Sequence, residues 1–200
     1  TLFEDIVKVI CTCNVAWRQT VAMVDRLVAH WGVAAGDGIT RAFPTPKILA
    51  DASPRNLRDI ARLGYRAEFV QRFAGDVAAG AIDLDAIERF DGTSDELQRQ
   101  LRTIHGIGPY AAGNIAMLLG RYDRLAPDTE LRRFLAERYP RVKWTPARAQ
   151  RHYDRWAPYQ FLAYWFELWS DYVRRHGEAD QWWPEDIGRD ITTPRRKKKK

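Results

Sequence analysis

Lysine and cysteine are both scarce in this chain of 200 residues, and each shortage narrows the chemistry open to it. Outside the last four residues, the only lysines are Lys8, Lys47 and Lys143. Covalent catalysis through a lysine amine therefore has few candidate nucleophiles. The only cysteines, Cys11 and Cys13, are one residue apart, which is a poor spacing for a disulfide. With four scattered histidines they offer too few grouped ligands for zinc, so we expect no metal site.

Long apolar runs and alternating patterns are also missing. No apolar run reaches the ~18 residues that a membrane span needs, and no secretory signal peptide is visible. We therefore expect no membrane partner and a location inside the cell, in the cytoplasm or nucleoid. Sustained alternation of period two, which is typical of strands, does not occur, whereas apolar residues recur at helical spacing. The sequence predicts an all-α fold.

The net charge of +6 comes entirely from one end of the chain. Residues 195–200 are all basic, and without them 26 basic residues balance 26 acidic ones. A surface that binds nucleic acid must therefore arise from segregation of charge on the body. We expect residues 188–200 to be a disordered basic tail that adds sequence-independent affinity for DNA by counterion release. Removing residues 195–200 should weaken this binding without altering chemistry.

The remaining chain, residues 1–187, is predicted to form one helical domain. Helix-start residues, glycine stops and apolar periodicity place the main boundaries, with Pro44 and Pro46 in a loop. After a first helix that begins at Thr1 and a second that stops at Gly32, helices are expected at about 53–64, 66–79, 83–90, 94–104, from 109 onward, 128–138, 146–156 and 158–174. A capping box is expected between Thr1 and Glu4.

A glycine-rich turn, Gly106-Ile107-Gly108, follows His105 and precedes a nearly all-apolar helix that begins at Pro109. Two glycines allow a ligand to approach the backbone closely, and a helix start adds free N–H groups and a positive dipole end. These features together suit a phosphate group. Ile107 is expected to insert into the core. The alternative is an ordinary helix–helix turn with a glycine cap.

Asp128 follows Pro127 and opens a helix, 20 residues after Gly108. Taken alone, this aspartate is best explained as a helix N-cap. Its combination with the hairpin resembles the helix-hairpin-helix–GPD superfamily of DNA glycosylases. The motif of that superfamily is a hairpin, an apolar helix, a Gly/Pro loop and a catalytic aspartate, and the matching residues are Ile104, Gly106, Ile107, Gly108, Gly120, Pro127 and Asp128. The resemblance implies two helical lobes with a cleft between them, backbone binding by residues 105–108 and Asp128 as the catalytic carboxylate.

Two further segments resemble the 8-oxoguanine glycosylase branch of this superfamily. ICTCNVAW (residues 10–17) places Asn14 where that branch has an asparagine that fills the gap left by a flipped base. RLGYRAEFV (residues 62–70) places Tyr65 at a wedge position and Arg66 at a position that reads the orphaned partner base. The alternatives are a helix-end cap for Asn14 and a core position for Tyr65.

WAPYQFLAYW (residues 156–165) resembles the late helix of the same branch, which lines the base pocket. The resemblance assigns to this pocket Tyr110, Tyr164, Trp165 and Leu168. The residues that read the oxidised base in that branch are not kept, because Tyr164 and Leu168 stand at their positions. The aromatic run Tyr164, Trp165, Phe166 and Trp169 could instead bind cationic alkylated bases. Its alternative interpretation is that at least two of these four side chains belong to the core.

Departures from the family pattern are equally informative. Tyr110 stands where the bifunctional enzymes carry a lysine that attacks the sugar, and a phenol forms no imine. In having tyrosine at this position, the chain resembles the mismatch thymine glycosylases. The four-cysteine cluster of endonuclease III relatives is absent from the sequence, so no iron–sulfur cluster is expected.

The sequence therefore predicts a monomeric, monofunctional DNA glycosylase of base excision repair. It would hydrolyse the N-glycosidic bond of an oxidised or alkylated purine flipped out of double-stranded DNA. No cofactor is expected, apart from a monovalent cation at the hairpin that the resemblance allows. Three alternatives stay open: a glycosylase for mismatched thymine or uracil, a bifunctional glycosylase/lyase, and a DNA-binding module without catalysis.

Overall fold

A computed structural model describes residues 1–178 of the chain. The described residues divide into two compact units, with the boundary between Leu119 and Gly120. Helices account for nearly all of the regular structure within the described residues. The one exception there is an antiparallel hairpin of two strands with two residues each. The prediction of an all-α fold is confirmed. No helix among the described residues is both long enough and apolar enough to span a membrane.

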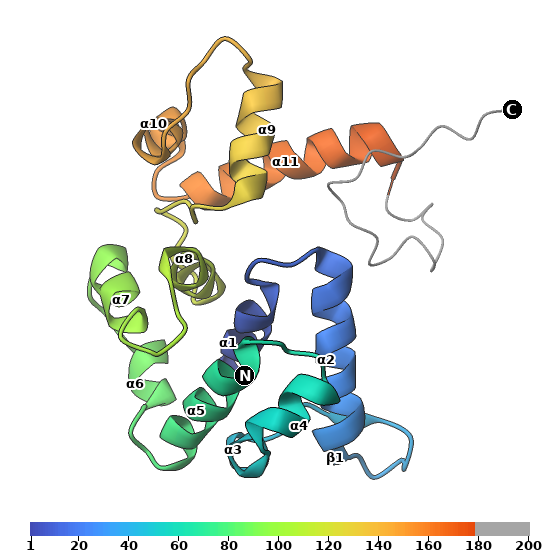
Figure 1. The fold of residues 1–200 in the computed structure, drawn as a ribbon. Helices are drawn as coiled ribbons and strands as arrows, with labels where there is room; N and C mark the ends of the chain where they lie inside the picture. Colours follow the sequence, from blue (N-terminus) through green and yellow to red (C-terminus); the bar gives the residue numbers. More distant parts are fainter. Residues whose placement is uncertain (179–200) are drawn as a thin grey trace, which may run out of the picture. The chain divides into compact units, whose positions relative to one another are not determined.

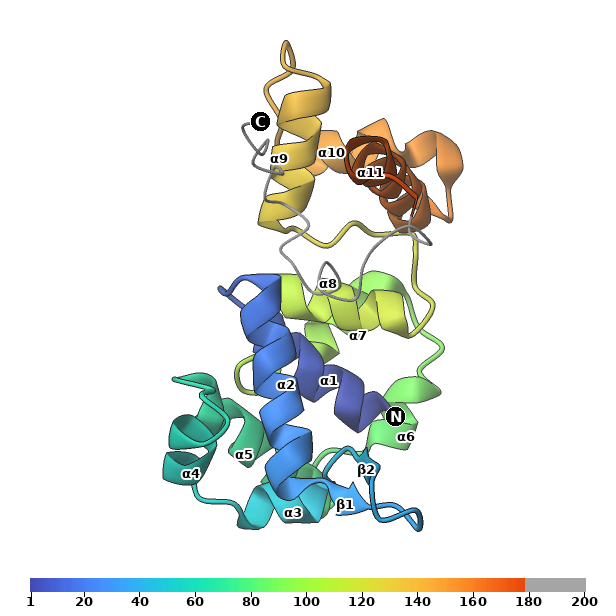
Figure 2. The same ribbon diagram turned by 90° about the vertical axis from the view of Figure 1, so that its right-hand side faces the viewer.

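The N-terminal unit is built around its first helix. Its elements are α1 (Leu2–Thr12), α2 (Trp17–Trp31), β1 (Val33–Ala34), β2 (Arg41–Ala42), α3 (Pro46–Asp51), α4 (Pro54–Asp59), α5 (Arg66–Ala78), α6 (Leu84–Glu88), α7 (Ser94–Leu101) and α8 (Pro109–Leu118). Helix α1 contacts α2, α5, α6 and α8, and it lies among them in both views (Figures 1 and 2). Its apolar side chains are almost completely buried, as those of Ile6 and Val7 illustrate.

Proline in the first turn marks the start of four helices, which are α3, α4, α8 and α10 (Pro146–His152). Proline is tolerated there because the first N–H groups of a helix have no partner within the helix. In α3 the hydroxyl of Thr45 accepts the amide of Ile48. The prediction of a loop is therefore correct for Pro44 and wrong for Pro46, because Thr45-Pro46 begins a helix. The equivalent pair Ser53-Pro54 predicts the start of α4 correctly.

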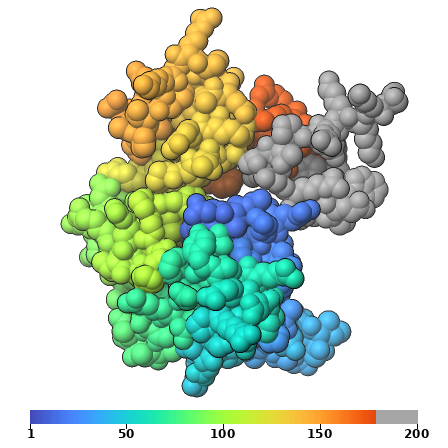
Figure 3. Space-filling model, in the orientation of Figure 1, coloured from blue at the N-terminus to red at the C-terminus, as the bar shows by residue number. Residues whose placement is uncertain are grey.

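Three helices end clearly earlier than expected. Helix α10 ends at His152 instead of 156, and the ends of the other two shape the candidate site. Helix α4 ends at Asp59 instead of near Gly64, and α7 ends at Leu101 instead of 104. The segment between α4 and α5 contains two left-handed residues, Arg62 and Gly64, which break helical geometry. Figure 3 shows α4 and the segment after it, in teal, on the face of this unit turned to the viewer.

Helix α1 is capped in a simpler way than expected. The Thr1 hydroxyl accepts the Glu4 amide, as predicted. The Glu4 carboxylate does not complete a capping box, because it binds the Lys8 ammonium at 2.5 Å instead. A complete capping box occurs at α7, between Thr93 and Glu96.

The C-terminal unit contains α9 (Thr129–Arg138), α10, the 3-10 helix η1 (Asp154–Trp156) and α11 (Gln160–His176). Phe134, Leu135, Tyr153, Tyr164 and Leu168 are buried in its core, with Leu131 and Ala149. A single carboxylate ties the elements together, because Glu167 of α11 accepts hydrogen bonds from Tyr139 at 2.9 Å and Tyr153 at 2.6 Å. The predicted tail, residues 188–200, and the domain boundary at 187 lie outside the described residues.

Candidate active site

The predicted hairpin lies between α7 and α8 and depends on one of its two glycines. Gly106 has a φ of +89°, and a Cβ atom there would lie 2.6 Å from the ring of Phe69. Gly108 is different, since a Cβ atom there would meet nothing within 4 Å. Ile107 is buried in the core, as predicted. Gly106 is thus required by packing, whereas Gly108 leaves the outer face of the turn open to a ligand.

The start of α8 faces this open side of the turn. Gly108 is its N-cap and supplies no capping side chain, and the helix dipole is positive at this end. The exposed His105 ring lies edge-on to Phe69, with ring centroids 5.0 Å apart. A helix of ten residues with an uncapped N-terminus suits a phosphate oxygen. The monovalent cation at this hairpin stays a prediction.

Asn14 and Tyr65 meet, although they come from different segments. The side-chain amide of Asn14 donates to the Tyr65 hydroxyl at 3.1 Å. Both side chains are exposed, and half of the Tyr65 surface (50%) remains accessible. The Tyr65 ring also contacts Phe69 edge-on. These positions exclude the core interpretation of Tyr65 and leave both groups able to contact a duplex.

Arg66 has a different position from the one predicted. Only 5% of its surface is exposed, and its guanidinium donates to the carbonyl oxygens of Cys13 and Leu63. The guanidinium carbon also lies 4.5 Å from the centre of the Tyr65 ring. The interpretation of Arg66 as a reader of the orphaned base is therefore not supported, because its donors are bound to the protein's own backbone. Arg66 instead joins the segment of Asn14 to the segment of Tyr65.

The carbonyls that Arg66 binds adjoin two unusual residues. Asn14 (φ 54°) and Arg62 (φ 59°) are the only non-glycine residues with positive φ in the described part of the chain. Cys13 precedes Asn14, and Leu63 follows Arg62. Left-handed conformations are costly for residues with a Cβ atom and concentrate at functional sites. The Arg66 guanidinium holds both strained segments in place.

Tyr110 is in the first turn of α8 and is half-buried against the core of the N-terminal unit. Its hydroxyl donates to the Thr12 hydroxyl oxygen at 3.3 Å. No lysine is close to Tyr110 in the sequence. The two lysines of this unit, Lys8 and Lys47, are ion-paired with Glu4 and Asp51.

Asp128 is the N-cap of α9 and is half-buried. Its Oδ1 accepts the Leu131 amide. Burial raises the pKa of this carboxyl, the Leu131 amide opposes the shift, and the negative charge of Glu130 adds to it. The cap interpretation is thus correct in geometry, yet the carboxylate is poorly solvated for a simple cap. A partly desolvated charge of this kind is common among catalytic groups.

The loop that leads to Asp128 is held by one glutamine. Gln150 of α10 donates from Nε2 to the Asp123 carbonyl at 2.9 Å, and its Oε1 accepts the Leu125 amide at 3.0 Å. The Tyr122 carbonyl accepts the Phe161 amide at 2.7 Å, which anchors the same loop to the start of α11. The approach to Asp128 is therefore fixed by α10 and α11.

The four residues of the predicted aromatic run on α11 divide unevenly between core and surface. Tyr164 is 2% exposed, and Leu168 is buried beside it. Burial, with a contribution from the Asp128 charge, raises the pKa of Tyr164, so its phenol is neutral. The assignment of Tyr164 and Leu168 to the base pocket is not supported, because both are part of the unit's own core.

The other three, Trp165, Phe166 and Trp169, all retain at least a third of their surface. The expectation that at least two of the four are core residues is therefore wrong. Trp165 and Trp169 lie one turn apart and line a small surface hollow of about 10 Å³ with Leu168, Tyr172, Glu130, Arg133 and Arg175. Of the predicted pocket residues in this unit, Trp165 alone is exposed.

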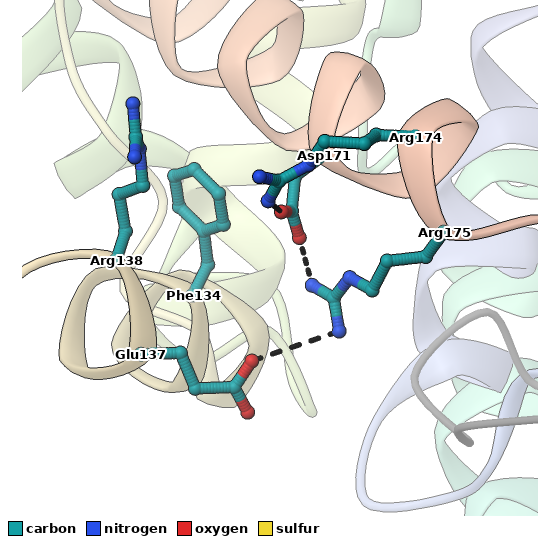
Figure 4. A pocket seen from close by; sticks show the side chains of 6 residues that line it. All are labelled: Phe134, Glu137, Arg138, Asp171, Arg174 and Arg175. Atoms are coloured by element: carbon teal, nitrogen blue, oxygen red, sulfur yellow. Dashed lines mark hydrogen bonds and ion pairs between the residues drawn. The ribbon is translucent and has the colours of Figure 1, made fainter.

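A second pocket, of about 310 Å³, lies at the C-terminal ends of α9 and α11 (Figure 4). It is lined by Phe134, Glu137, Arg138, Asp171, Arg174 and Arg175. Asp171 binds both Arg174 and Arg175, and Glu137 binds Arg175 at 3.6 Å. Because most of its charges neutralise one another, this pocket has no clear preference for an anion.

Comparison with known proteins places the chain in a family. Residues 7–158 match the model of the HhH-GPD superfamily of base excision DNA repair proteins, and the chain belongs to that superfamily. It is 29% identical over 161 residues to DNA-3-methyladenine glycosylase 2 of Escherichia coli, covering 76% of this chain and 54% of that protein.

Solved structures agree on the fold. The 8-oxoguanine glycosylase/lyase of Clostridium acetobutylicum, solved with double-stranded DNA that contains cytosine opposite 8-oxoguanine, matches with a TM-score of 0.71 at 17% identity, over 86% of this chain and 60% of that one. The DNA-3-methyladenine glycosidase of Bacillus halodurans matches with a TM-score of 0.63 at 25% identity, over 85% of this chain and 75% of that one. The chain spans little more than half of the length of the E. coli relative.

The predicted residues fall into two groups, one in each unit. Asn14, Tyr65, the hairpin and Tyr110 belong to the N-terminal unit, whereas Asp128 and Trp165 belong to the C-terminal unit. Sequence reasoning missed Gln150 and the bond between Tyr110 and Thr12, which no local pattern signals. It also missed Arg62, whose left-handed backbone is invisible in a sequence because glycine normally marks that conformation.

Proposed function

We propose that this protein is a monofunctional DNA glycosylase that hydrolyses the N-glycosidic bond of a damaged purine in duplex DNA. The observation that carries the proposal is Asp128, a half-buried carboxylate at a helix start whose pKa is raised by burial. Backbone binding alone does not require such a group. Its place after the Gly106–Gly108 hairpin, in a member of a base excision repair superfamily, gives the carboxylate a substrate.

In the proposed reaction, Asp128 acts as an ionised group beside the sugar. As the bond between C1′ and the base nitrogen lengthens, positive charge develops on the sugar, and the carboxylate stabilises it. The electron pair of that bond leaves with the base, and a water molecule adds to C1′ and loses a proton. Poor solvation strengthens the attraction between the carboxylate and the sugar cation. The Leu131 amide orients Oδ1 and keeps the group from rotating away.

Base extrusion is the proposed role of Asn14 and Tyr65. A glycosylase must remove its target nucleotide from the stack and fill the space it leaves. The 3.1 Å hydrogen bond between the two side chains presents an aromatic ring and an amide as one exposed unit. Arg66, bound behind them, limits the movement of both segments. This support suits a rigid wedge.

Hydrolysis without a lyase step is supported by Tyr110. Its phenol cannot form the imine through which bifunctional enzymes cleave the strand. Lys8 and Lys47 are held in ion pairs on the N-terminal unit. The C. acetobutylicum glycosylase/lyase shares the fold at 17% identity, so that likeness does not transfer its lyase activity.

Among damaged purines, an alkylated and therefore cationic base is the first class to test. Trp165 and Trp169 present exposed aromatic surface on α11, and Glu130 lies beside them. Aromatic faces attract cations, and Trp does so most strongly. The E. coli and B. halodurans relatives are described as 3-methyladenine enzymes. Oxidised purines are the second class, because Asn14 and Tyr65 match that branch of the family.

The test is a set of duplexes that each carry one lesion: an alkylated purine, 8-oxoguanine, or a mismatched thymine or uracil. We expect free base and a strand break only after alkali treatment, with the highest rate for an alkylated purine. Asp128→Asn serves as the inactive control. Strand cleavage without alkali, or a covalent adduct trapped by borohydride, would instead indicate a lyase.

Two further results would change the proposal in different ways. Release of mismatched thymine or uracil alone would favour a mismatch-specific glycosylase. No release of any base, with DNA binding retained, would favour a non-catalytic module.

Tyr110→Lys offers a matched variant, because it places an amine at the position of the family nucleophile. Borohydride trapping that appears only in this variant would support the assignment of Tyr110.

A further inference from the structure

Five of the ten exposed arginines of the N-terminal unit have an acidic partner, and Arg41 donates to the Gly32 carbonyl. The pairs are Arg55–Asp59, Arg58–Glu68, Arg72–Asp76, Arg89–Asp85 and Arg99–Glu96. Within the described residues, four exposed arginines of this unit have neither a side-chain hydrogen bond nor an ion pair, and they are Arg18, Arg26, Arg62 and Arg102. Unpaired guanidinium groups are available to an external anion.

Arg62 occupies a backbone position that its residue type disfavours. Its φ of 59° is left-handed, a conformation that glycine adopts without steric cost. The next residue, Leu63, is buried, and its carbonyl accepts the guanidinium of Arg66. Arg66 therefore fixes the segment from the buried side, while the Arg62 side chain is exposed to solvent. Tyr65, the proposed wedge, is three residues further on.

Arg18 is disfavoured for an electrostatic reason. It is the second residue of α2, where the helix dipole is positive, and the first turn contains no acidic residue. The N-cap, Ala16, makes no side-chain hydrogen bond. Asn14, the other half of the Asn14–Tyr65 pair, is four residues earlier in the chain.

We infer that Arg18 and Arg62 bind backbone phosphates of DNA beside the base pair that Asn14 and Tyr65 open. Each arginine is locally disfavoured in the free protein, and each would gain a partner only when a polyanion is bound. Local conflicts of this kind are expected at functional positions. Phosphates are the ligands that match two separate guanidinium groups of this sort, and they position a protein without reading sequence. The inference rests on the proposed function for its setting.

The division of labour between the arginines follows from burial. Arg66 is committed to carbonyls of the protein and fixes the two segments from inside. Arg18 and Arg62 come from these same two segments and are exposed. Phosphate contacts at both would bring the wedge to a defined register on the duplex before a base is extruded.

The experiment measures binding of an undamaged duplex over a range of salt concentrations. Arg62→Gly, Arg18→Gln and the double variant are compared with two controls, Arg58→Gln, which is ion-paired, and Arg26→Gln, which is unpaired but two turns further along α2. Each lost phosphate contact should lower the slope of log affinity against log salt by about 0.9. At 0.1 M salt this corresponds to about eightfold weaker binding for each single variant, and the difference should shrink toward 1 M.

Arg62→Gly also separates function from folding. Glycine relieves the left-handed strain, so the melting temperature should stay the same or rise while affinity falls. Equal losses in Arg26→Gln, or an unchanged salt slope in both test variants, would overturn the inference. A loss in excision that depends on the base opposite the lesion would also overturn it, since phosphates carry no sequence information.

Failure of this inference is distinguishable from failure of the proposed function. Binding to undamaged duplex requires no excision, so the salt slopes report on Arg18 and Arg62 alone. If the wild-type protein released no base from any lesion but both variants lost slope, the phosphate contacts would stand without the glycosylase. If bases were released but the slopes stayed unchanged, the glycosylase would stand without these contacts.

Discussion

The side-chain amide of Asn14 lies 3.1 Å from the hydroxyl of Tyr65 and donates a hydrogen bond to it. The two residues are 51 positions apart in the chain, and both side chains are exposed. Each therefore supports the other at the surface of the unit instead of being buried in its core. An exposed polar–aromatic pair held by a buried guanidinium is an arrangement suited to entering a nucleic-acid stack.

The wedge is tested by two substitutions at Tyr65. Tyr65→Ala should slow excision from a stable base pair far more than from a mismatch, because opening costs a few kcal/mol and least for mismatched bases. Tyr65→Phe keeps the ring but removes the acceptor for Asn14, so its defect should be smaller. Single-turnover excision rates give the comparison. Equal losses on both substrates, with the fold intact, would contradict the wedge.

The hairpin glycines should respond in opposite ways. Gly106→Ala should destabilise the protein by at least about 1–2 kcal/mol, because its φ of +89° is left-handed and the new Cβ atom meets the Phe69 ring. Gly108→Ala should cost much less, since its Cβ position is open and only the preference for glycine at an N-cap is lost. If phosphate approaches this turn, however, Gly108→Ala should weaken DNA binding. Melting curves and duplex titrations measure both effects, and normal DNA binding by Gly108→Ala would contradict the phosphate site.

Asp128→Asn should separate capping from catalysis. Asparagine caps helices as well as aspartate does, so the fold should persist. Excision should fall by about a hundredfold or more, because the charge beside the developing sugar cation is lost. Because burial raises the pKa of Asp128, the charged form costs folding stability above that pKa. The variant should therefore melt at the same or a higher temperature at neutral pH, and near-normal excision would refute the proposed mechanism.

The pH dependence of excision should report the same carboxyl group. Excision requires ionised Asp128, so the rate should fall as the pH drops through its raised pKa, above the range of an ordinary aspartate. Glu130 contributes to that shift through its negative charge. Glu130→Gln should therefore move the acidic limb of the profile to lower pH. A limb that stays in place, or moves upward, would show that another group controls the rate.

Much of the N-terminal unit could be predicted because its signals are local. Ser53-Pro54 starts α4, and Gly32 ends α2, each for a reason contained within a few residues. The helix missed at Thr45-Pro46 carried the same signal as α4, so that error came from treating two nearby prolines as a loop. Glycine spacing likewise located the hairpin, because the Gly106 conformation leaves few other residue types possible.

The errors in the site concern burial, which depends on tertiary packing. Helical spacing on α11 could not decide whether Tyr164 or Trp165 faces the core, since apolar residues occupy several faces of that helix. A sequence also cannot reveal that Arg66 points inward, because arginine is usually exposed and its partners here are backbone carbonyls. Side-chain identity therefore located the site but did not assign every role within it.

The buried Arg66 has a consequence for the way this surface opens. Releasing either the Cys13 or the Leu63 carbonyl would leave part of a charged group inside the protein without a partner, which is costly. The segments of Asn14 and Tyr65 should therefore lose their protection from hydrogen exchange together, as one cooperative unit, and not one after the other. The wedge then has only two states, assembled or open. That behaviour would let the protein sense an altered base pair as an all-or-none event.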